Sequence, residues 1–322
     1  MIAFFEKIIV FIVSGAYLIC SIFMGNGFDS IIRYKNTVKD VSAYTNTIKT
    51  AVPQTEIYDA VKGHFESQLP AGKTQKKAIV IGYDGCRADC LSLINDEHPS
   101  AIGALLEDGG FAAITYCGGK NFPLMNNQAT STAPGWCSML TGVWADKHGI
   151  TDNSIVKSME YPTLLTSLVE GKVIDDSAFY VSWGGHFTDS NSTYFEEKNY
   201  IEEKGLDVSF LRANDDAGTF ANTVADLKKA DCSDFIFSIF EYPDHTGHDE
   251  GFSLYNDEYP AAFYEAEETG LQVINAIKSR PAYNTEDWLI IITSDHGGST
   301  FGHGGMSIQE RITFAVSNKE IF

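Results

Sequence analysis

The sequence is poor in basic residues, with 23 Lys and Arg against 43 Asp and Glu, which gives a formal charge of −20. The deficit lies after residue 77, where 14 basic residues stand against 37 acidic ones. A domain of this charge repels the phosphate backbone of DNA and RNA over most of its surface, so nucleic-acid binding is not expected. Bound metal ions would still make one pocket locally positive.

Cysteine is also scarce. The chain has six, of which Cys20 lies in an apolar N-terminal segment. The other five are an odd number and are widely spaced, which excludes a dense disulfide framework. Cys86 and Cys90 are one helical turn apart, a spacing that is only a weak indication of a zinc site. Internal repeats and low-complexity tracts are absent, and 322 residues suffice for one sizeable α/β domain and a short extra segment.

Charge is absent from residues 8–25, an apolar run of 18 residues, close to the length that crosses a bilayer. No A-x-A-like cleavage site is obvious at its end, so we predict an uncleaved signal anchor, a membrane helix, within residues 1–28. A cleaved signal peptide and a buried core helix remain alternatives. Residues 29–76 are expected to form a stalk or packing extension, and residues 77–322 a catalytic domain.

Short apolar runs dominate the rest of the chain. Residues 78–83, 234–240 and 288–293 have the pattern of strands buried on both faces of a parallel sheet. Further strands are expected at 111–116, 179–183 and 312–316, and helices at 220–229 and 261–278. The alternation predicts an α/β fold with a doubly wound, mostly parallel sheet and helices on both faces.

The first three of these runs each lead to an aspartate: Asp84, Asp244 and Asp295. One such aspartate is usually a helix cap, but ligands of open α/β sheets bind beyond the carboxyl ends of the strands. Three histidines lie nearby: His248 in DHTGH, His296 in SDHGG and His303 in FGHGG. Carboxylate and imidazole together suit Zn²⁺, Mn²⁺ or Fe, and six ligands suit a metal pair. Such a pair can clamp the attacking and leaving oxygens of a phosphoryl displacement.

Three hydroxyl residues, Thr130, Ser131 and Thr132, precede Pro134. A proline near the first helical position predicts a helix that starts here and runs to Thr141. Each hydroxyl could be an ordinary N-cap. A helix N-terminus also attracts phosphate, so one of the three is a candidate nucleophile.

Four blocks in this order resemble the alkaline phosphatase superfamily, and most closely its type I phosphodiesterase/nucleotide pyrophosphatase branch. They are IGYDGCRAD from residue 81, TAPGWCSMLTGVWADKHGI at residues 132–150, PDHTGH and SDHGG. They span most of the chain after residue 77. The resemblance implies an alkaline phosphatase-like fold and a phosphoric ester hydrolase with two divalent metal ions. Zn²⁺ is the expected ion and Mn²⁺ the alternative.

The resemblance also implies roles for individual residues. Thr132 stands at the position of the nucleophile and of a metal ligand, and Asn153 at that of an asparagine that hydrogen-bonds a phosphate oxygen. Asp84, Asp295 and His296 would bind one metal ion together with Thr132. The ligands of the other ion would be Asp244, His248 and His303. The implied reaction passes through a phosphothreonine that water then hydrolyses.

The chain departs from the family pattern after its nucleophile. Pro134-Gly135-Trp136 replaces the usual Pro-Asn-His, and the insertions that build a nucleotide pocket look short. Nucleotide specificity is therefore open. Trp183, His186 and Tyr242 could line a substrate pocket, although a structural role is the ordinary explanation for each.

Three other functions compete with ester hydrolysis. A sulfatase would need C/S-x-P-x-R, and residues 132–136 lack both the Cys or Ser and the Arg. An inactive binding domain would tolerate loss of the ligands, which are intact. A membrane-anchored transferase of phosphoglycerol or phosphoethanolamine remains the main rival. The family resemblance favours an extracytoplasmic catalytic domain, whereas the basic residues after the apolar run argue weakly for a cytoplasmic one.

Overall fold

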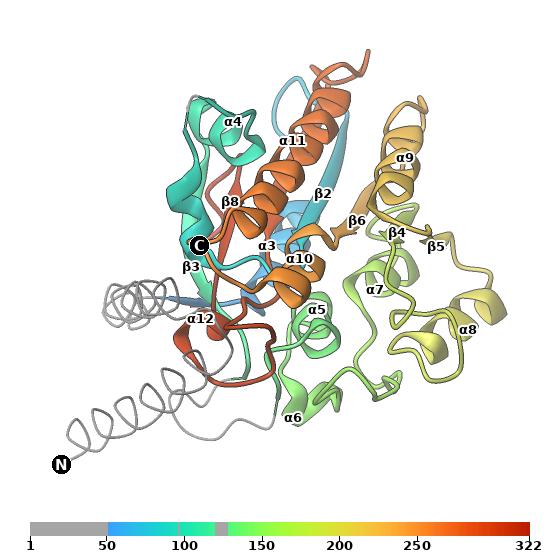
Figure 1. The fold of residues 1–322 in the computed structure, drawn as a ribbon. Coiled ribbons are helices and arrows are strands. Elements are labelled where there is room, and N and C mark those ends of the chain that lie inside the picture. Colours follow the sequence, from blue (N-terminus) through green and yellow to red (C-terminus); the bar gives the residue numbers. More distant parts are fainter. Residues whose placement is uncertain (1–50, 96, 120–127) are drawn as a thin grey trace, which may run out of the picture. The chain divides into compact units, whose positions relative to one another are not determined.

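The computed structural model describes residues 51–95, 97–119 and 128–322, which belong to one compact unit, Ile48–Phe322 (Figure 1). The strands are β1 (Val52–Pro53), β2 (Gln75–Tyr83), β3 (Phe111–Tyr116), β4 (Ser177–Val181), β5 (Val208–Arg212), β6 (Phe235–Phe240), β7 (Glu286–Thr293) and β8 (Ile312–Ser317). The helices are α3 (Glu56–Glu66), α4 (Ala101–Glu107), α5 (Thr132–Thr141), α6 (Ala145–His148), α7 (Leu164–Glu170), α8 (Phe195–Lys204), α9 (Asp216–Leu227), α10 (Tyr242–Glu250), α11 (Glu258–Lys278) and α12 (Ile308–Arg311), with a 3₁₀ helix η2 (Ala88–Leu93).

These strands form an eight-stranded sheet in the order β1-β3-β8-β7-β2-β6-β4-β5. β2 pairs in parallel with β6 and β7, and β4 pairs in parallel with β5 and β6. Among the described strands only β8 is reversed, because it runs antiparallel to both β3 and β7. The prediction of a mostly parallel sheet is confirmed, with one antiparallel strand that the sequence did not reveal.

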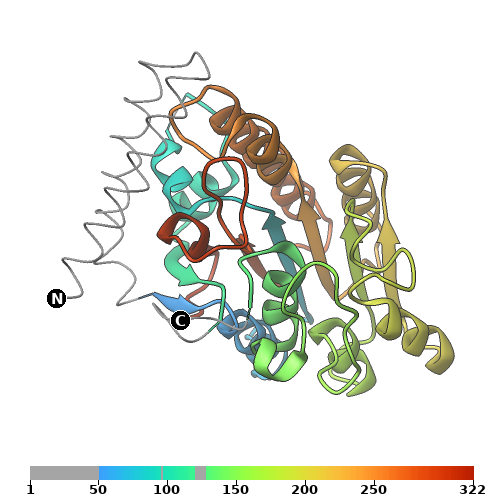
Figure 2. The same cartoon turned by 60° about the horizontal axis from the view of Figure 1, so that its bottom comes forward.

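Helices cover both faces of the sheet. Every residue of β6, β7 and β8 is buried, and successive side chains of a strand point to opposite faces, so both faces must be covered. α4, α9 and α10 contact α11, whereas α3, α5 and α7 contact one another (Figure 2). The first group includes the predicted helix at 261–278, which is confirmed as α11 and begins three residues earlier.

α5 packs unusually close to the sheet. A Cβ atom on Gly82 of β2 would lie 2.4 Å from the ring of Trp136, so only glycine leaves room for this indole. The helix ends at Gly142, whose φ of 69° lies in the left-handed region that favours glycine. This packing places the start of α5 near the carboxyl ends of the central strands.

Part of the expected stalk or packing extension lies in this unit. Ile57 and Val61 of α3 are buried and belong to the hydrophobic core. The predicted signal anchor at residues 1–28 lies outside the described residues. Among the described residues, no helix is both long and apolar enough to span a membrane.

Candidate metal and phosphate site

Three aspartates meet at the carboxyl ends of three neighbouring strands. Asp84 directly follows β2, Asp295 lies two residues after β7, and Asp244 lies in the first turn of α10, which follows β6. β2 lies between the other two strands in the sheet. Asp84 and Asp295 have no exposed surface, and Asp244 is 6% exposed. The sheet topology therefore brings together carboxylates that lie up to 211 residues apart in the sequence.

The three predicted histidine ligands share one arrangement. The Nδ1 atom of His248 lies 3.1 Å from the carbonyl oxygen of Phe301, and that of His303 lies 3.0 Å from the carbonyl oxygen of Thr130. His296 Nδ1 lies 2.8 Å from its neighbour's carbonyl oxygen. A carbonyl oxygen only accepts, so each Nδ1–H donates and each Nε2 is the free ring nitrogen.

Each free Nε2 atom faces aspartate oxygens. The Nε2 of His296 lies 3.4 Å from Asp84 Oδ1 and 3.3 Å from Asp295 Oδ2. Asp244 has two histidines beside it, with His303 Nε2 3.6 Å from Oδ1 and His248 Nε2 3.5 Å from Oδ2. His248 is at the rim, since 44% of its side chain is exposed.

Two groups of donor atoms are close enough to hold one metal ion each: Asp84, Asp295 and His296, and Asp244, His296 and His303. The atoms of each group lie within 4.8 Å of one another. Three buried atoms in these groups have no hydrogen-bond partner: Asp244 Oδ1, Asp295 Oδ2 and His296 Nε2. Buried oxygens without a partner would gain ligands from cations. The Nδ1 hydrogen bonds also hold each histidine so that its Nε2 atom can bind a metal ion, and both features suit a pair of divalent cations.

The electrostatics indicate the same need for cations. Burial, followed by the charges of neighbouring carboxylates, raises the pKa of both Asp84 and Asp295 well above the ordinary range. Burial raises the pKa of Asp244 to about 7 and, together with the neighbouring His248, lowers that of His303 to about 4. Among the described residues, only histidines lie within ion-pair distance of the three aspartates. No Lys or Arg among the described residues forms an ion pair with any of the three aspartates.

Thr132 is the first residue of α5 and lies next to this cluster. Its Oγ1 lies 3.4 Å from Asp84 Oδ1, and the residue is 4% exposed. Ser131 is the N-cap residue but makes no side-chain capping hydrogen bond. The backbone N–H of Ala133 donates to Asn153 Oδ1 at 2.9 Å, which leaves the Asn153 amide group as a donor beside the helix start. The structure thus places Thr132 and Asn153 together at one helix N-terminus.

Trp136 is a site residue whose role the sequence did not reveal. Its indole N–H donates to Asp84 Oδ2 at 2.8 Å, so it fixes the carboxylate that lies beside Thr132. Trp136 stands four residues after Thr132, on the same face of α5, and this spacing was the available signal. The departure from the family's Pro-Asn-His pattern therefore supplies a hydrogen bond to a predicted metal ligand.

Glu241 was missed as well. It directly follows β6, lies two residues before the PDHTGH block and is 2% exposed. Burial raises its pKa well above the ordinary range, and the charges of Asp84, Asp216 and Asp244 act in the same direction. A glutamate directly after an apolar run was the signal in the sequence.

Five further residues that the sequence analysis singled out belong to neither metal group. His186 is completely buried against Trp183 and Phe179, with ring centroids 5.0 and 5.4 Å away, so it is part of the packing. Trp183 and Tyr242 are half-buried. Cys86 and Cys90 are buried free thiols, and neither described metal group contains a cysteine.

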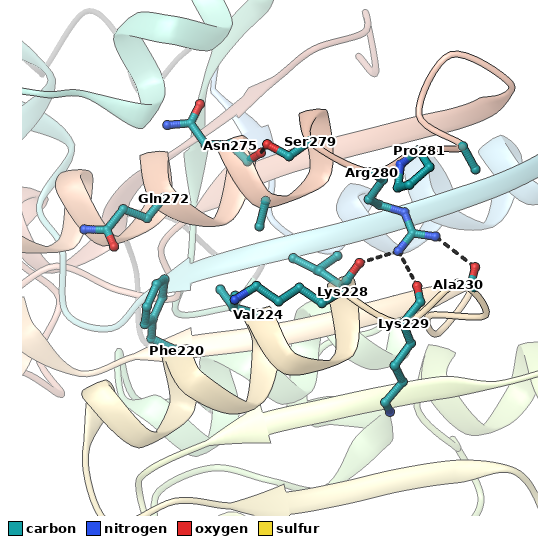
Figure 3. A pocket seen from close by; sticks show the side chains of 13 residues that line it. Phe220, Val224, Lys228, Lys229, Ala230, Gln272, Asn275, Ser279, Arg280 and Pro281 are labelled. Carbon is teal, nitrogen blue, oxygen red and sulfur yellow. Dashed lines mark hydrogen bonds between the residues drawn. The ribbon is translucent and has the colours of Figure 1, made fainter.

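A separate cavity of about 620 Å³ lies between α9 and the end of α11 (Figure 3). Arg280 lies at one end of it and donates to the carbonyl oxygens of Lys229 and Ala230 at 2.8 and 3.2 Å. These bonds satisfy carbonyls just beyond α9. None of the predicted catalytic or metal-binding residues lines this cavity.

The fold and this site define an α/β protein with a polar cluster at the carboxyl ends of its central strands. Residues 78–312 match the family described as type I phosphodiesterase/nucleotide pyrophosphatase, and the chain belongs to this family. Venom phosphodiesterases from Macrovipera lebetinus and Naja atra are each 24% identical over 72% of this chain. The chain spans only 26% and 27% of their respective lengths.

Solved structures show weaker similarity. Murine ectonucleotide pyrophosphatase/phosphodiesterase 5 has a TM-score of 0.47 and 18% identity, covering 69% of this chain and 57% of that protein. A phosphonate monoester hydrolase of Agrobacterium radiobacter has a TM-score of 0.49 and 14% identity, covering 76% of this chain and 68% of the hydrolase.

Proposed function

We propose that this protein hydrolyses phosphate esters, with phosphodiesters as the first substrate class, through Thr132 and two divalent cations, Zn²⁺ before Mn²⁺. The observation that carries the proposal is the position of the Thr132 hydroxyl, at the N-terminus of α5 and 3.4 Å from Asp84. Family membership supports the reaction class. The substrate itself is part of the proposal.

Two sets of residues would hold the cations. Asp84, Asp295 and His296 would bind one ion beside Thr132, and Asp244, His248 and His303 would bind the other. His296 lies within reach of both positions. When bound, the cations would lower the pKa of the attacking hydroxyl and neutralise charge on the phosphate and leaving oxygens.

The chain's own groups would then position the ester. The N-terminus of α5 offers backbone N–H groups and a partial positive charge to the phosphate. Asn153, whose Oδ1 accepts from Ala133, would donate its amide N–H to a phosphate oxygen. The Thr132 oxygen would lose its proton and bond to phosphorus as the ester oxygen leaves on the opposite side. Water would then cleave the phosphothreonine.

The test is cleavage of bis-p-nitrophenyl phosphate by the purified full chain. We expect a chelator to abolish activity and Zn²⁺ or Mn²⁺ to restore it. Thr132→Ala should lower kcat at least about 1,000-fold because the nucleophile is lost. Thr132→Ser keeps a hydroxyl and should retain measurable activity. Circular dichroism would confirm that both variants fold.

Wild-type activity in the Thr132→Ala variant, or full activity in chelator, would overturn the proposal. Parallel assays with p-nitrophenyl phosphate would separate monoester from diester preference. A diacylglycerol acceptor in the same reaction would reveal the transferase alternative. With a substrate labelled in its phosphoryl group, a transferase would put the label on the lipid, whereas a hydrolase would release it into solution.

We also propose that residues 8–25 anchor the protein in a membrane, with the catalytic domain on the extracytoplasmic side. The uncharged run of 18 residues supports this. Carbonate extraction of membranes from expressing cells, followed by protease treatment of intact cells, would test it. Release of the protein by carbonate would contradict anchoring, and protection from protease would contradict the orientation.

A further inference from the structure

Glu241 is a buried acid, and one of its carboxyl oxygens has no partner among the described residues. It is the N-cap residue of α10, yet its side chain makes no capping hydrogen bond. Its Oε1 atom is inaccessible to solvent and has no hydrogen-bond partner, and among the described residues no Lys, Arg or His pairs with it. Burying a polar group without a partner costs free energy, so this carboxyl group requires an explanation.

The backbone around Glu241 is firmly held. Asp216, in the first turn of α9, accepts the Glu241 N–H on Oδ2 at 2.7 Å and the Ser182 hydroxyl on Oδ1 at 2.9 Å. Asp216 is itself 6% exposed. A buried carboxyl group from another helix thus holds the backbone of the turn between β6 and α10.

This turn lies at the metal site. β6 is the neighbour of β2, so the residue after β6 lies beside Asp84, and Asp244 follows three residues later. The charges of Asp84 and Asp244 add to burial in raising the pKa of Glu241. Without cations, a fourth carboxylate would only add repulsion to Asp84, Asp244 and Asp295. With cations, the same group adds attraction.

We propose that Glu241 is a positioning residue of the metal centre, whose carboxylate strengthens the binding of divalent cations by the three aspartates. The inference rests on the metal centre of the proposed function and extends it to a residue outside the predicted ligand set. The Glu241 carboxylate would supply a hydrogen-bond acceptor and a negative charge next to the ligands. Loss of such a group next to metal ligands typically lowers metal affinity about 10- to 100-fold.

The test compares the full-length wild type with Glu241→Gln, an exchange of nearly the same size. Both proteins are stripped with chelator, dialysed and titrated with Zn²⁺ by calorimetry in a competing chelator. We expect the variant to bind Zn²⁺ about 10- to 100-fold more weakly at one site or more. Its metal-free thermal midpoint should equal or exceed that of the wild type, because the exchange breaks no hydrogen bond of the Glu241 Oε1 atom.

Glu267→Gln is the matched control. Glu267 is also a buried glutamate with an unpartnered Oε1 atom, but its Oε2 accepts hydrogen bonds from Ser100 and from the Ile102 N–H. This variant should lose stability and keep wild-type Zn²⁺ affinity. Glu241→Asp retains the charge on a shorter arm and should bind Zn²⁺ with intermediate affinity.

Two results would overturn the inference alone: wild-type Zn²⁺ affinity in Glu241→Gln, or a lower metal-free midpoint of that variant. The second result would show that the carboxylate has a structural partner. If the wild type itself bound no Zn²⁺ or Mn²⁺, the proposed metal centre would fail, and this inference with it. The wild-type titration therefore separates the two failures.

Discussion

Asp84 receives a hydrogen bond from an indole rather than from a charged group. Burial raises the pKa of this carboxyl, and the Trp136 N–H acts in the opposite direction by stabilising the ionised form. Arg or Lys at this place would neutralise the carboxylate and compete with a cation. An indole N–H orients it and leaves its charge available to a metal ion.

Replacing Trp136 with Phe tests this role, because the ring is kept and the N–H is lost. Asp84 Oδ2 would be left buried without its partner, at a cost of about 1–3 kcal/mol in the free energy of unfolding. We also expect kcat to fall about tenfold or more, because the carboxylate beside Thr132 is no longer fixed. Urea unfolding and diesterase assays measure the two effects.

Trp288→Phe is the matched control. The Trp288 indole also donates to a buried carboxylate, at 2.8 Å to Glu286 Oε2, but at the start of β7, far from its carboxyl end. This variant should lose stability and keep its kcat. An equal loss of kcat in both variants would mean that Trp136 acts only through global stability.

At the scale of elements, the segment that carries Asn153 is anchored by a buried ion pair. Lys157 Nζ lies 3.1 Å from Glu197 Oε2 of α8, and both side chains are fully buried. The other oxygen of Glu197 accepts from the N–H and the hydroxyl of Thr163, at 2.8 and 2.7 Å. One carboxylate thus ties residues 157 and 163 of the connection between α6 and α7 to α8.

Glu197→Gln should lower the free energy of unfolding by about 3 kcal/mol, because Lys157 would remain buried without a counter-charge. Adding Lys157→Met should recover part of this loss. Urea unfolding gives the values, with Glu66→Gln as the control. Glu66 pairs with Lys62 at the surface, where a pair contributes about 0.5 kcal/mol or less. Equal costs at the two positions would contradict the anchoring role.

At the scale of the whole molecule, local signals predicted the central strands and the three aspartates. Continuous apolar runs such as residues 78–83 are readable because both faces of these strands are buried. β5 was missed because it is a short strand at the edge of the sheet with exposed side chains such as Leu211. The reversed direction of β8 cannot be read from its six residues, since a short buried strand has the same pattern in either direction.

The candidate site, like the fold, was only partly predictable from the sequence. Residue types and spacing pointed to Asp84, Asp244, Asp295 and the histidines, which the fold brings together. Trp136 reaches Asp84, 52 residues away in the sequence, from a helix that packs on the sheet, and Glu241 lies beside Asp84 because β6 is the neighbour of β2. Spacing within α5 places Trp136 on the face of Thr132, but the carboxylate that each residue lies beside is visible only when the strand order and the packing of α5 are known.

The fold as a whole buries several histidines in the neutral form. Burial lowers the pKa of His186 to about 3, and burial, followed by nearby lysines, lowers those of His64 and His148 to about 4. Between these values and the unfolded pKa near 6.5, the unfolded chain binds more protons than the folded one. Above pH 6.5 these neutral histidines cost no stability. As the pH falls below 6.5 the free energy of unfolding decreases, down to about pH 4 for His64 and His148 and about pH 3 for His186.

His186→Phe isolates the largest of these contributions. Neither ring nitrogen of His186 has a hydrogen-bond partner, and the ring packs among Phe179, Trp183 and Tyr194. We therefore expect the variant to be at least as stable as the wild type at pH 7. From pH 7 to pH 5 the free energy of unfolding of the wild type should fall by about 2 kcal/mol more than that of the variant.

Urea unfolding measures both, and a chelator in the buffer keeps metal binding out of the comparison. His98→Gln, at an exposed position, is the control and should follow the wild type. Parallel pH profiles of the wild type and His186→Phe would mean that the His186 site accepts a proton without cost, and that acid acts on the fold through other groups.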